Sequence, residues 1–197
     1  ITSKLADGVL KRQQLQKKIN KLNALEDEVK IRNTVEYVLK EFPKKQITEI
    51  DNKENILLLD QITDPRNLGA IIRIAAAFGI EDIIITKQFK PQDISLIAKA
   101  SSGGLEYVSL IEVTNLSRAI EQLKETGYWV AGLDSDAECN IQELKDSKQV
   151  AIIMGEEGKG LRRLTREKCD QMYKIKTLGK ITSLNVSTAA AITLYSL

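Results

Sequence analysis

Histidine is absent from this sequence of 197 residues, and that absence narrows the chemistry available to the protein. Without histidine, neither a Ser-His-Asp nor a Cys-His nucleophile can be assembled, and a zinc site is disfavoured. We therefore predict no metal site. Any catalysis has to use Arg, Lys, Asp, Glu, Ser, Thr or Tyr side chains, or backbone groups.

Cysteine is scarce, and long apolar runs are missing. Cys139 and Cys169 show neither metal-ligand spacing nor a disulfide framework, which fits a reducing cytoplasm. No apolar run reaches the length of a membrane span, and the basic residues near the N-terminus flank no signal-peptide core. We therefore expect a cytoplasmic protein without a membrane partner.

The net charge is only +2, but the charges are unevenly distributed. Asp7 is the one acidic residue among the first 22, which contain the basic residues Lys4, Lys11, Arg12, Lys17, Lys18 and Lys21. Residues 1–32 also place leucine and isoleucine along one stripe, as an amphipathic helix does. A basic arm of this kind often binds nucleic acid, and the alternative is the solvated face of an ordinary helix. Residues 34–50 are ambiguous, although their start suggests a short strand.

From Asn55 onward, predicted strands alternate with predicted helices. The strands are expected at residues 56–60, 82–86, 107–109, 129–133, 150–154 and 171–175. The helices are expected at about 67–78, 91–99, 114–126, 160–168 and 185–196. This alternation predicts an α/β fold, with a mostly parallel sheet and helices on both faces. The order of the strands cannot be read from the pattern.

The segment after the first strand, residues 60–78, is the first of three candidate site loops, because ligands of open α/β sheets bind beyond the carboxyl ends of strands. At 100° per residue, one helix face collects Leu68, Ile71, Ile72, Ile74, Ala75 and Phe78. Arg73 lies on the opposite face among the small residues Gly69, Ala70, Ala76 and Ala77. Either a ligand approaches the helix closely at Arg73, or Arg73 is a solvent-facing arginine.

The second loop, residues 155–160, is a glycine-rich turn between a strand and a helix. Its glycines permit close backbone approach, as a cofactor site requires. The spacing matches neither a P-loop nor the dinucleotide fingerprint, and Glu156 and Glu157 would repel a bound phosphate. A ligand loop and a structural turn are both compatible with this pattern.

The third loop, residues 175–185, is polar and leads into an apolar helix that reaches Leu197. An apolar closing segment is buried, and it carries hydroxyl and amide groups with it that need partners. The alternative is a core helix capped by Ser183 or Asn185, since both residue types cap helices well.

Together, the three loops resemble the three motifs of the SpoU-type (TrmH-like) RNA 2′-O-ribose methyltransferases of the SPOUT superfamily, over about residues 55–197. Asn67-x-Gly69-x-x-x-Arg73 is similar to motif one. Gly155-x-Glu157-Gly158-x-Gly160-Leu161 is similar to motif two, and Ser183-Leu-Asn185-Val-Ser187 to motif three. The run Arg162-Arg-Leu-Thr-Arg-Glu is most similar to the bacterial branch that acts on 23S ribosomal RNA at guanosine.

The resemblance implies a C-terminal deep trefoil knot that binds S-adenosylmethionine in a bent shape. It also implies a homodimer with the active site near the subunit interface. Residues 1–50 are then a basic helical segment, or the remnant of an RNA-binding domain with its linker. Residues 51–197 are the catalytic domain.

The family's motif-one arginine is proposed as the general base, which places that role on Arg73. The alternative is that Arg73 orients the adjacent phosphate and stabilises the developing alkoxide, because arginine keeps its proton at neutral pH. The resemblance also implies that Asn67 and Glu157 position the ribose and Arg73, while Ser183 and Asn185 shape the catalytic pocket. Backbone groups expected to hold the cofactor are those of Gly155, Ile175 and Leu184, with Leu133 and Leu178 as further candidates.

One position departs from the family pattern, which usually has Ile-Pro-Met where this chain has Ile175-Lys176-Thr177. Proline stiffens a loop by fixing φ, so Lys176 is expected to weaken cofactor binding. The leading hypothesis is methylation of a 2′-OH in 23S ribosomal RNA. A tRNA ribose methyltransferase and a non-catalytic RNA-binding or ribosome-assembly module are the alternatives, and the complete set of motif residues favours an enzyme over the module.

Overall fold

The computed structural model describes residues 17, 45–50, 54–89, 93–144, 149–180 and 183–197. The helix predicted over residues 1–32, apart from Lys17, and the strand suggested after residue 34 lie outside these ranges. A 3-10 turn, η1 (Ile47–Glu49), precedes the sheet. No helix within the described ranges is both long enough and apolar enough to cross a bilayer.

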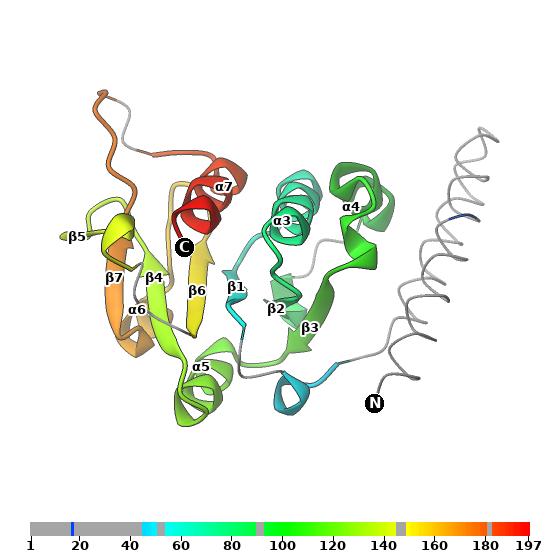
Figure 1. The fold of residues 1–197 in the computed structure, drawn as a ribbon, viewed down its shortest axis with the longest axis horizontal. Helices are drawn as coiled ribbons and strands as arrows, with labels where there is room; N and C mark the ends of the chain where they lie inside the picture. Colours follow the sequence, from blue (N-terminus) through cyan, green and yellow to red (C-terminus); the bar gives the residue numbers. More distant parts are fainter. Residues whose placement is uncertain (1–16, 18–44, 51–53, 90–92, 145–148, 181–182) are drawn as a thin grey trace.

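A single sheet of seven parallel strands, in the order β3-β2-β1-β6-β4-β7-β5, organises the chain (Figure 1). The strands are β1 (Ile56–Asp60), β2 (Asp82–Thr86), β3 (Ser109–Val113), β4 (Trp129–Leu133), β5 (Cys139–Asn140), β6 (Val150–Gly155) and β7 (Gln171–Lys174). All residues of β1 are buried, because β1 lies between β2 and β6 with helices on both sides. The predicted α/β class and the parallel sheet are confirmed.

The strand predicted at residues 107–109 is present, but its predicted bounds are wrong, because it runs from Ser109 to Val113. A 3-10 turn, η3 (Gly104–Glu106), occupies the preceding residues, and β3 starts only at Ser109. The backbone N–H of Ser109 donates to the Glu81 carbonyl at 2.7 Å, which starts the pairing with β2. The two-residue strand β5 is not predicted, because so short a segment has no periodicity.

Five α-helices correspond to the five predicted ones, with shifted ends. They are α3 (Pro65–Ala77), α4 (Ile94–Ser101), α5 (Leu116–Glu125), α6 (Arg163–Lys168) and α7 (Val186–Ser196). The side chains of Asp64, Asp93, Asn115 and Asn185 cap four of them. The first three residues of the predicted helix at 160–168 are not helical, because Gly160 has a φ of 67° and pairs with Glu156 in an isolated bridge.

Successive residues of β1 face opposite sides of the sheet, as the period of a strand requires. Leu57 and Leu59 belong to a core shared with α3 and α7, whereas Leu58 belongs to a second core shared with α5. Figure 1 shows α3, α4 and α7 on one side of the sheet and α5 on the other. The α6 helix packs beside α5. Helices on both faces are therefore confirmed.

The register of β1 and β6 places two of the predicted loops side by side. Asp60, the last residue of β1, lies opposite Gly155, the last residue of β6. Because the strands are parallel, the loops that follow them leave the same edge of the sheet. This edge carries the candidate site, as expected for an open α/β sheet.

Candidate active site

Asn185 connects all three predicted motifs by hydrogen bonds. Its Nδ2 donates to Asn67 Oδ1 at 3.0 Å and to Glu157 Oε2 at 3.2 Å. Its Oδ1 accepts from the backbone N–H of Ser187 at 2.9 Å and from the Ser187 hydroxyl at 2.6 Å. We call Asn67, Glu157 and Asn185 the amide cluster.

Each member of the amide cluster is held by the element that carries it. Asn67 lies in the first turn of α3, which starts at Pro65 and is capped by Asp64. Glu157 lies in the loop after β6, and Asn185 is itself the cap of α7. The capping role predicted for Asn185 and its role in the cluster are therefore compatible, because its oxygen caps the helix while its nitrogen contacts the other motifs.

The loop after β6 folds tightly back on itself. The N–H of Gly160 donates to the Glu156 carbonyl at 2.8 Å. A Cβ on Gly155 would lie 2.2 Å from the carbonyl carbon of Gly160, so only glycine fits there. The buried carboxylate of Asp60 holds the far end of the loop in place. It accepts hydrogen bonds from Arg162 N at 3.0 Å and from Arg162 Nε at 2.6 Å. The side chain of Asp60 is 0% exposed.

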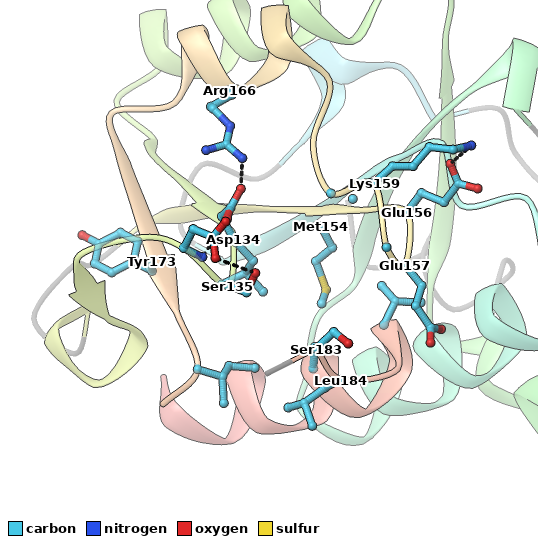
Figure 2. Close-up of a pocket in the computed structure, with 18 residues that line it drawn as sticks. Asp134, Ser135, Met154, Glu156, Glu157, Lys159, Arg166, Tyr173, Ser183 and Leu184 are labelled. Atoms are coloured by element: carbon cyan, nitrogen blue, oxygen red, sulfur yellow. Dashed lines mark hydrogen bonds and ion pairs between the residues drawn. The ribbon is translucent and has the colours of Figure 1, made fainter. Parts of the chain in front are cut away.

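A cavity of about 260 Å³ opens between this loop, the end of β4 and the start of α7 (Figure 2). Apolar side chains form one part of its lining, and they are Leu133, Met154, Tyr173, Ile175, Leu184, Val186 and Ala189. Polar residues complete the lining, and they are Asp134, Ser135, Asp136, Glu156, Glu157, Lys159, Arg166 and Ser183, together with the loop glycines Gly155, Gly158 and Gly160. Such a mixed lining suits a small molecule with an apolar and a charged part.

Two ion pairs order the polar part of the lining. Asp134, whose side chain is 7% exposed, pairs with Arg166 of α6. Lys159 Nζ lies 3.0 Å from Glu156 Oε2. Figure 2 shows both pairs at the cavity, with Asp134 and Arg166 on the side away from Ser183 and Leu184. The Asp134–Arg166 pair joins the loop after β4 to α6.

Most of the sequence-predicted site residues meet at this cavity. Gly155, Ile175, Leu184 and Leu133 line it, together with Glu157 and Ser183. Asn67 and Asn185 join it through the amide cluster. Leu178 is 94% exposed and is not among the lining residues, and Lys176 is exposed outside the lining as well.

Arg73 lies apart from the cluster. Its side chain is exposed, and its Nη1 donates to Ser102 Oγ at 3.4 Å, at the end of α4. The small-residue face predicted around Arg73 is covered in part by this chain itself, because Gly69 is buried against Ala100 and the Ile97 carbonyl. The predicted apolar face of α3 is confirmed except at its end, where Phe78 is 44% exposed because the helix has already stopped at Ala77.

A model of the SpoU rRNA Methylase family matches residues 54–195 of the chain. The chain belongs to this family. A Bacillus subtilis protein assigned to the TrmH family of tRNA/rRNA methyltransferases is 40% identical over 151 residues, which are 77% of this chain and 61% of that protein. A relative from Staphylococcus aureus strain MSSA476 has the same identity and coverage. The chain thus spans 61% of the length of these relatives.

Two solved methyltransferase structures agree with the observed fold. The AdoMet-bound rRNA methyltransferase of Sinorhizobium meliloti gives a TM-score of 0.71 at 26% identity, covering 78% of this chain and 60% of that one. The SpoU methyltransferase AviRb of Streptomyces viridochromogenes, in complex with AdoMet, gives 0.68 at 25% identity, covering 75% and 57%.

The contacts made by four residues near the SpoU motifs were not predicted from the sequence. Asp60 and Arg162 fasten the second motif, and Asp134 and Arg166 border the cavity. Asp60 gave a signal that could have been used, because a charged residue at the end of an otherwise apolar buried strand needs a partner. Asp134 gave no such signal, since it lies in a polar segment.

Burial changes the acid–base behaviour of two side chains in this SpoU family member. It raises the pKa of the Cys169 thiol to about 11, so Cys169 is unsuited to act as a thiolate nucleophile. Burial also raises the pKa of Glu106, in the turn that follows α4. Within the described ranges, no three His, Cys, Asp or Glu side chains are grouped as metal ligands would be.

Proposed function

We propose that this protein transfers a methyl group from S-adenosylmethionine to a ribose 2′-OH in RNA, at a guanosine of 23S ribosomal RNA. The observation that carries the proposal is the amide cluster, because Asn185 ties all three motifs together beside one cavity. The relatives named for tRNA and rRNA methylation support the reaction class.

The cavity fits the cofactor by the chemistry of its lining. Apolar side chains such as Leu133 and Ile175 suit the flat adenine, and backbone groups at Gly155 and Leu184 suit its polar edge. The carboxylate of Asp136 suits the cationic part of the cofactor, whereas that of Asp134 is already paired with Arg166. Leu178 remains a candidate only through its backbone, since its side chain is directed to solvent. When bound, the cofactor supplies an electrophilic methyl group.

The chain's own residues then have to place the ribose and assist loss of the hydroxyl proton. Asn67, Glu157, Ser183 and Asn185 lie at or next to the cavity, where they can hold the ribose in line with the methyl group. Arg73 is exposed, so we assign to it the role of a cation that orients the adjacent phosphate and stabilises the developing alkoxide. This assignment replaces the general-base role implied by the resemblance.

The finer family properties are part of the same proposal. We assign residues 51–197 to the catalytic domain and residues 1–50 to a basic segment or the remnant of an RNA-binding domain. The trefoil knot rests on the resemblance to the family, and it requires the C-terminal segment to lie at the loop after β6, where Asn185 contacts Glu157. A crystal structure with a continuous trace through residues 175–197 would test it.

A homodimer in the cytoplasm completes the proposal. Tyr195, which is 81% exposed, stacks edge-on against the exposed ring of Phe78, and these rings supply apolar surface to a second copy. Sedimentation equilibrium should give twice the chain mass, and a monomer at micromolar concentration would contradict the dimer.

Mapping 2′-O-methyl groups in ribosomal and transfer RNA, from cells with and without the protein, tests the function. Loss of one methylated guanosine in 23S ribosomal RNA is expected. Loss of a tRNA site instead would favour the tRNA alternative. Unchanged RNA, together with no calorimetric binding of S-adenosylmethionine, would favour the non-catalytic module.

A further inference from the structure

Arg73 is in contact with a turn that belongs to none of the three motifs. This turn, which we call the Ser102 turn, consists of Ser102, Gly103 and Gly104 and joins α4 to η3. The Ser102 hydroxyl accepts from Arg73 Nη1 at 3.4 Å. The guanidinium proposed to act on RNA therefore has an acceptor supplied by a different helix.

The backbone of the Ser102 turn is unusual. Ser102 has a φ of 47° and a ψ of 45°, in the left-handed region, and Gly103 follows with a φ of 89°. Serine is rare in that region, where glycine or asparagine is favoured. A residue kept there at a cost points to a use for its side chain, and the contact of its hydroxyl with Arg73 supplies one.

The same turn also contacts the backbone of Arg73. A Cβ on Gly104 would lie 3.1 Å from Arg73 Cα and 3.1 Å from the Ile72 carbonyl oxygen. The start of η3 is therefore seated directly on α3 at the position of Arg73. The Ser102 turn thus contacts Arg73 both at its backbone and, through the Ser102 hydroxyl, at the end of its side chain.

We propose that the Ser102 turn positions Arg73 for methyl transfer, with Ser102 as the positioning residue. This inference rests on the role proposed for Arg73. An exposed arginine populates many rotamers, and ordering it costs conformational entropy. A hydrogen-bond acceptor on a neighbouring turn restricts these rotamers beforehand, so less entropy is lost when RNA binds. Without the hydroxyl, the guanidinium is still present but reaches its productive position less often.

Replacing Ser102 by glycine tests this role without straining the backbone. Ser102→Gly removes the hydroxyl, and glycine tolerates the left-handed conformation. The single-turnover rate of methyl transfer at saturating RNA and cofactor should fall about three- to tenfold, as expected for one hydrogen bond. The cofactor Kd should not rise, and the melting temperature should not fall. Ser102→Asn should recover most of the rate, because asparagine tolerates the same conformation and its Oδ1 can accept from Arg73.

The matched control is Ser117→Ala, which removes a hydroxyl from α5 on the opposite side of the sheet and should leave the rate unchanged. An unchanged rate in Ser102→Gly, or an equal loss in Ser102→Asn, would overturn the positioning role.

A second measurement does not depend on turnover. The ¹⁵N side-chain resonance of Arg73 should show greater mobility in Ser102→Gly than in the parent protein, and equal mobility would overturn the role. If the parent protein methylates no RNA while the mobility difference is present, the proposed function fails and the positioning contact stands.

Discussion

The two chemically important positions of α3 are held in different ways. Asn67, in the first turn, is bonded to Asn185, which also contacts Glu157, so it belongs to a cluster beside the cavity. Arg73, further along the same helix, is exposed and contacts the Ser102 turn instead. In the proposed function both positions act on the RNA, the cluster on the ribose beside the cavity and Arg73 on the adjacent phosphate. Variants that disturb either position should slow methyl transfer, and loss of Asn185 should also lower the free energy of unfolding, because Asn185 caps α7.

Arg73→Ala should give the largest effect on turnover. Methyl transfer should fall about 10²- to 10⁴-fold, the usual range for one group acting on the proton or charge of the reacting oxygen. The cofactor Kd should stay within about twofold, because Arg73 does not line the cavity. Single-turnover kinetics and calorimetry measure the two quantities. Arg66→Ala, which removes an exposed arginine from the same helix, is the control. Full activity in Arg73→Ala would remove this residue from the mechanism.

Asn185→Ala tests the amide cluster, to which Asn67 belongs. The variant should lose about 0.5–2 kcal/mol of unfolding free energy with its helix cap. It should also lose at least about tenfold in methyl transfer, because Asn67 and Glu157 lose the partner that places them.

Asn115→Ala is the matched control for the cap, since Asn115 caps α5 away from the cavity. It should show the same loss of stability with full activity. Chemical denaturation and the transfer assay measure the two effects. Equal activity in the two variants would show that Asn185 acts only as a cap.

Arg162→Ala should act on stability more than on chemistry. It leaves the buried carboxylate of Asp60 without its charged partner, and the free energy of unfolding should fall by about 2–3 kcal/mol. Its neighbour Arg163 makes an exposed pair with Glu167, so Arg163→Ala should cost less than about 0.5 kcal/mol. Urea unfolding of both variants measures the difference, and similar losses would contradict the fastening role of Asp60.

Leu178→Ala should have the smallest effect. Its side chain is exposed, so the cofactor Kd should change less than about twofold. Ile175→Ala, which removes an apolar group from the cavity lining, should raise the Kd about tenfold. Calorimetric titration of both variants compares them. A large change in Leu178→Ala would mean that residues 176–180 close over the bound cofactor.

The pattern of apolar residues was sufficient to predict most individual strands and helices, but it was insufficient to predict how they are arranged in the sheet. Strands such as β1 and β2 have uniformly apolar centres between turn residues, so their bounds were predicted correctly. The boundary of β3 was missed because its start depends on pairing with β2 rather than on its own residues. Strand order depends on contacts between distant segments, and local periodicity contains no information about them.

In the candidate site, too, the residues of the motifs could be predicted from the sequence, whereas contacts between distant segments could not. The resemblance to a family identified Asn67, Glu157 and Asn185, which the structure then brings together. The Asp60–Arg162 pair joins residues 102 apart, and no spacing rule predicts such a contact. The contact between Arg73 and Ser102 was missed for the same reason, since the two residues lie on different helices.

The position of β1 between β2 and β6 in the sheet has a consequence for synthesis. β1 can pair with β2 once both are made, but its other edge has to wait for β6, and the hydrogen bond from Val150 N–H to Asn55 Oδ1 spans 95 residues. At about 5–20 residues per second, a ribosome needs roughly 5–20 s to make that interval. During this time an apolar strand edge is open to wrong pairing. The strand order that brings the motifs together therefore also sets how long this edge of β1 stays unpaired in the nascent chain.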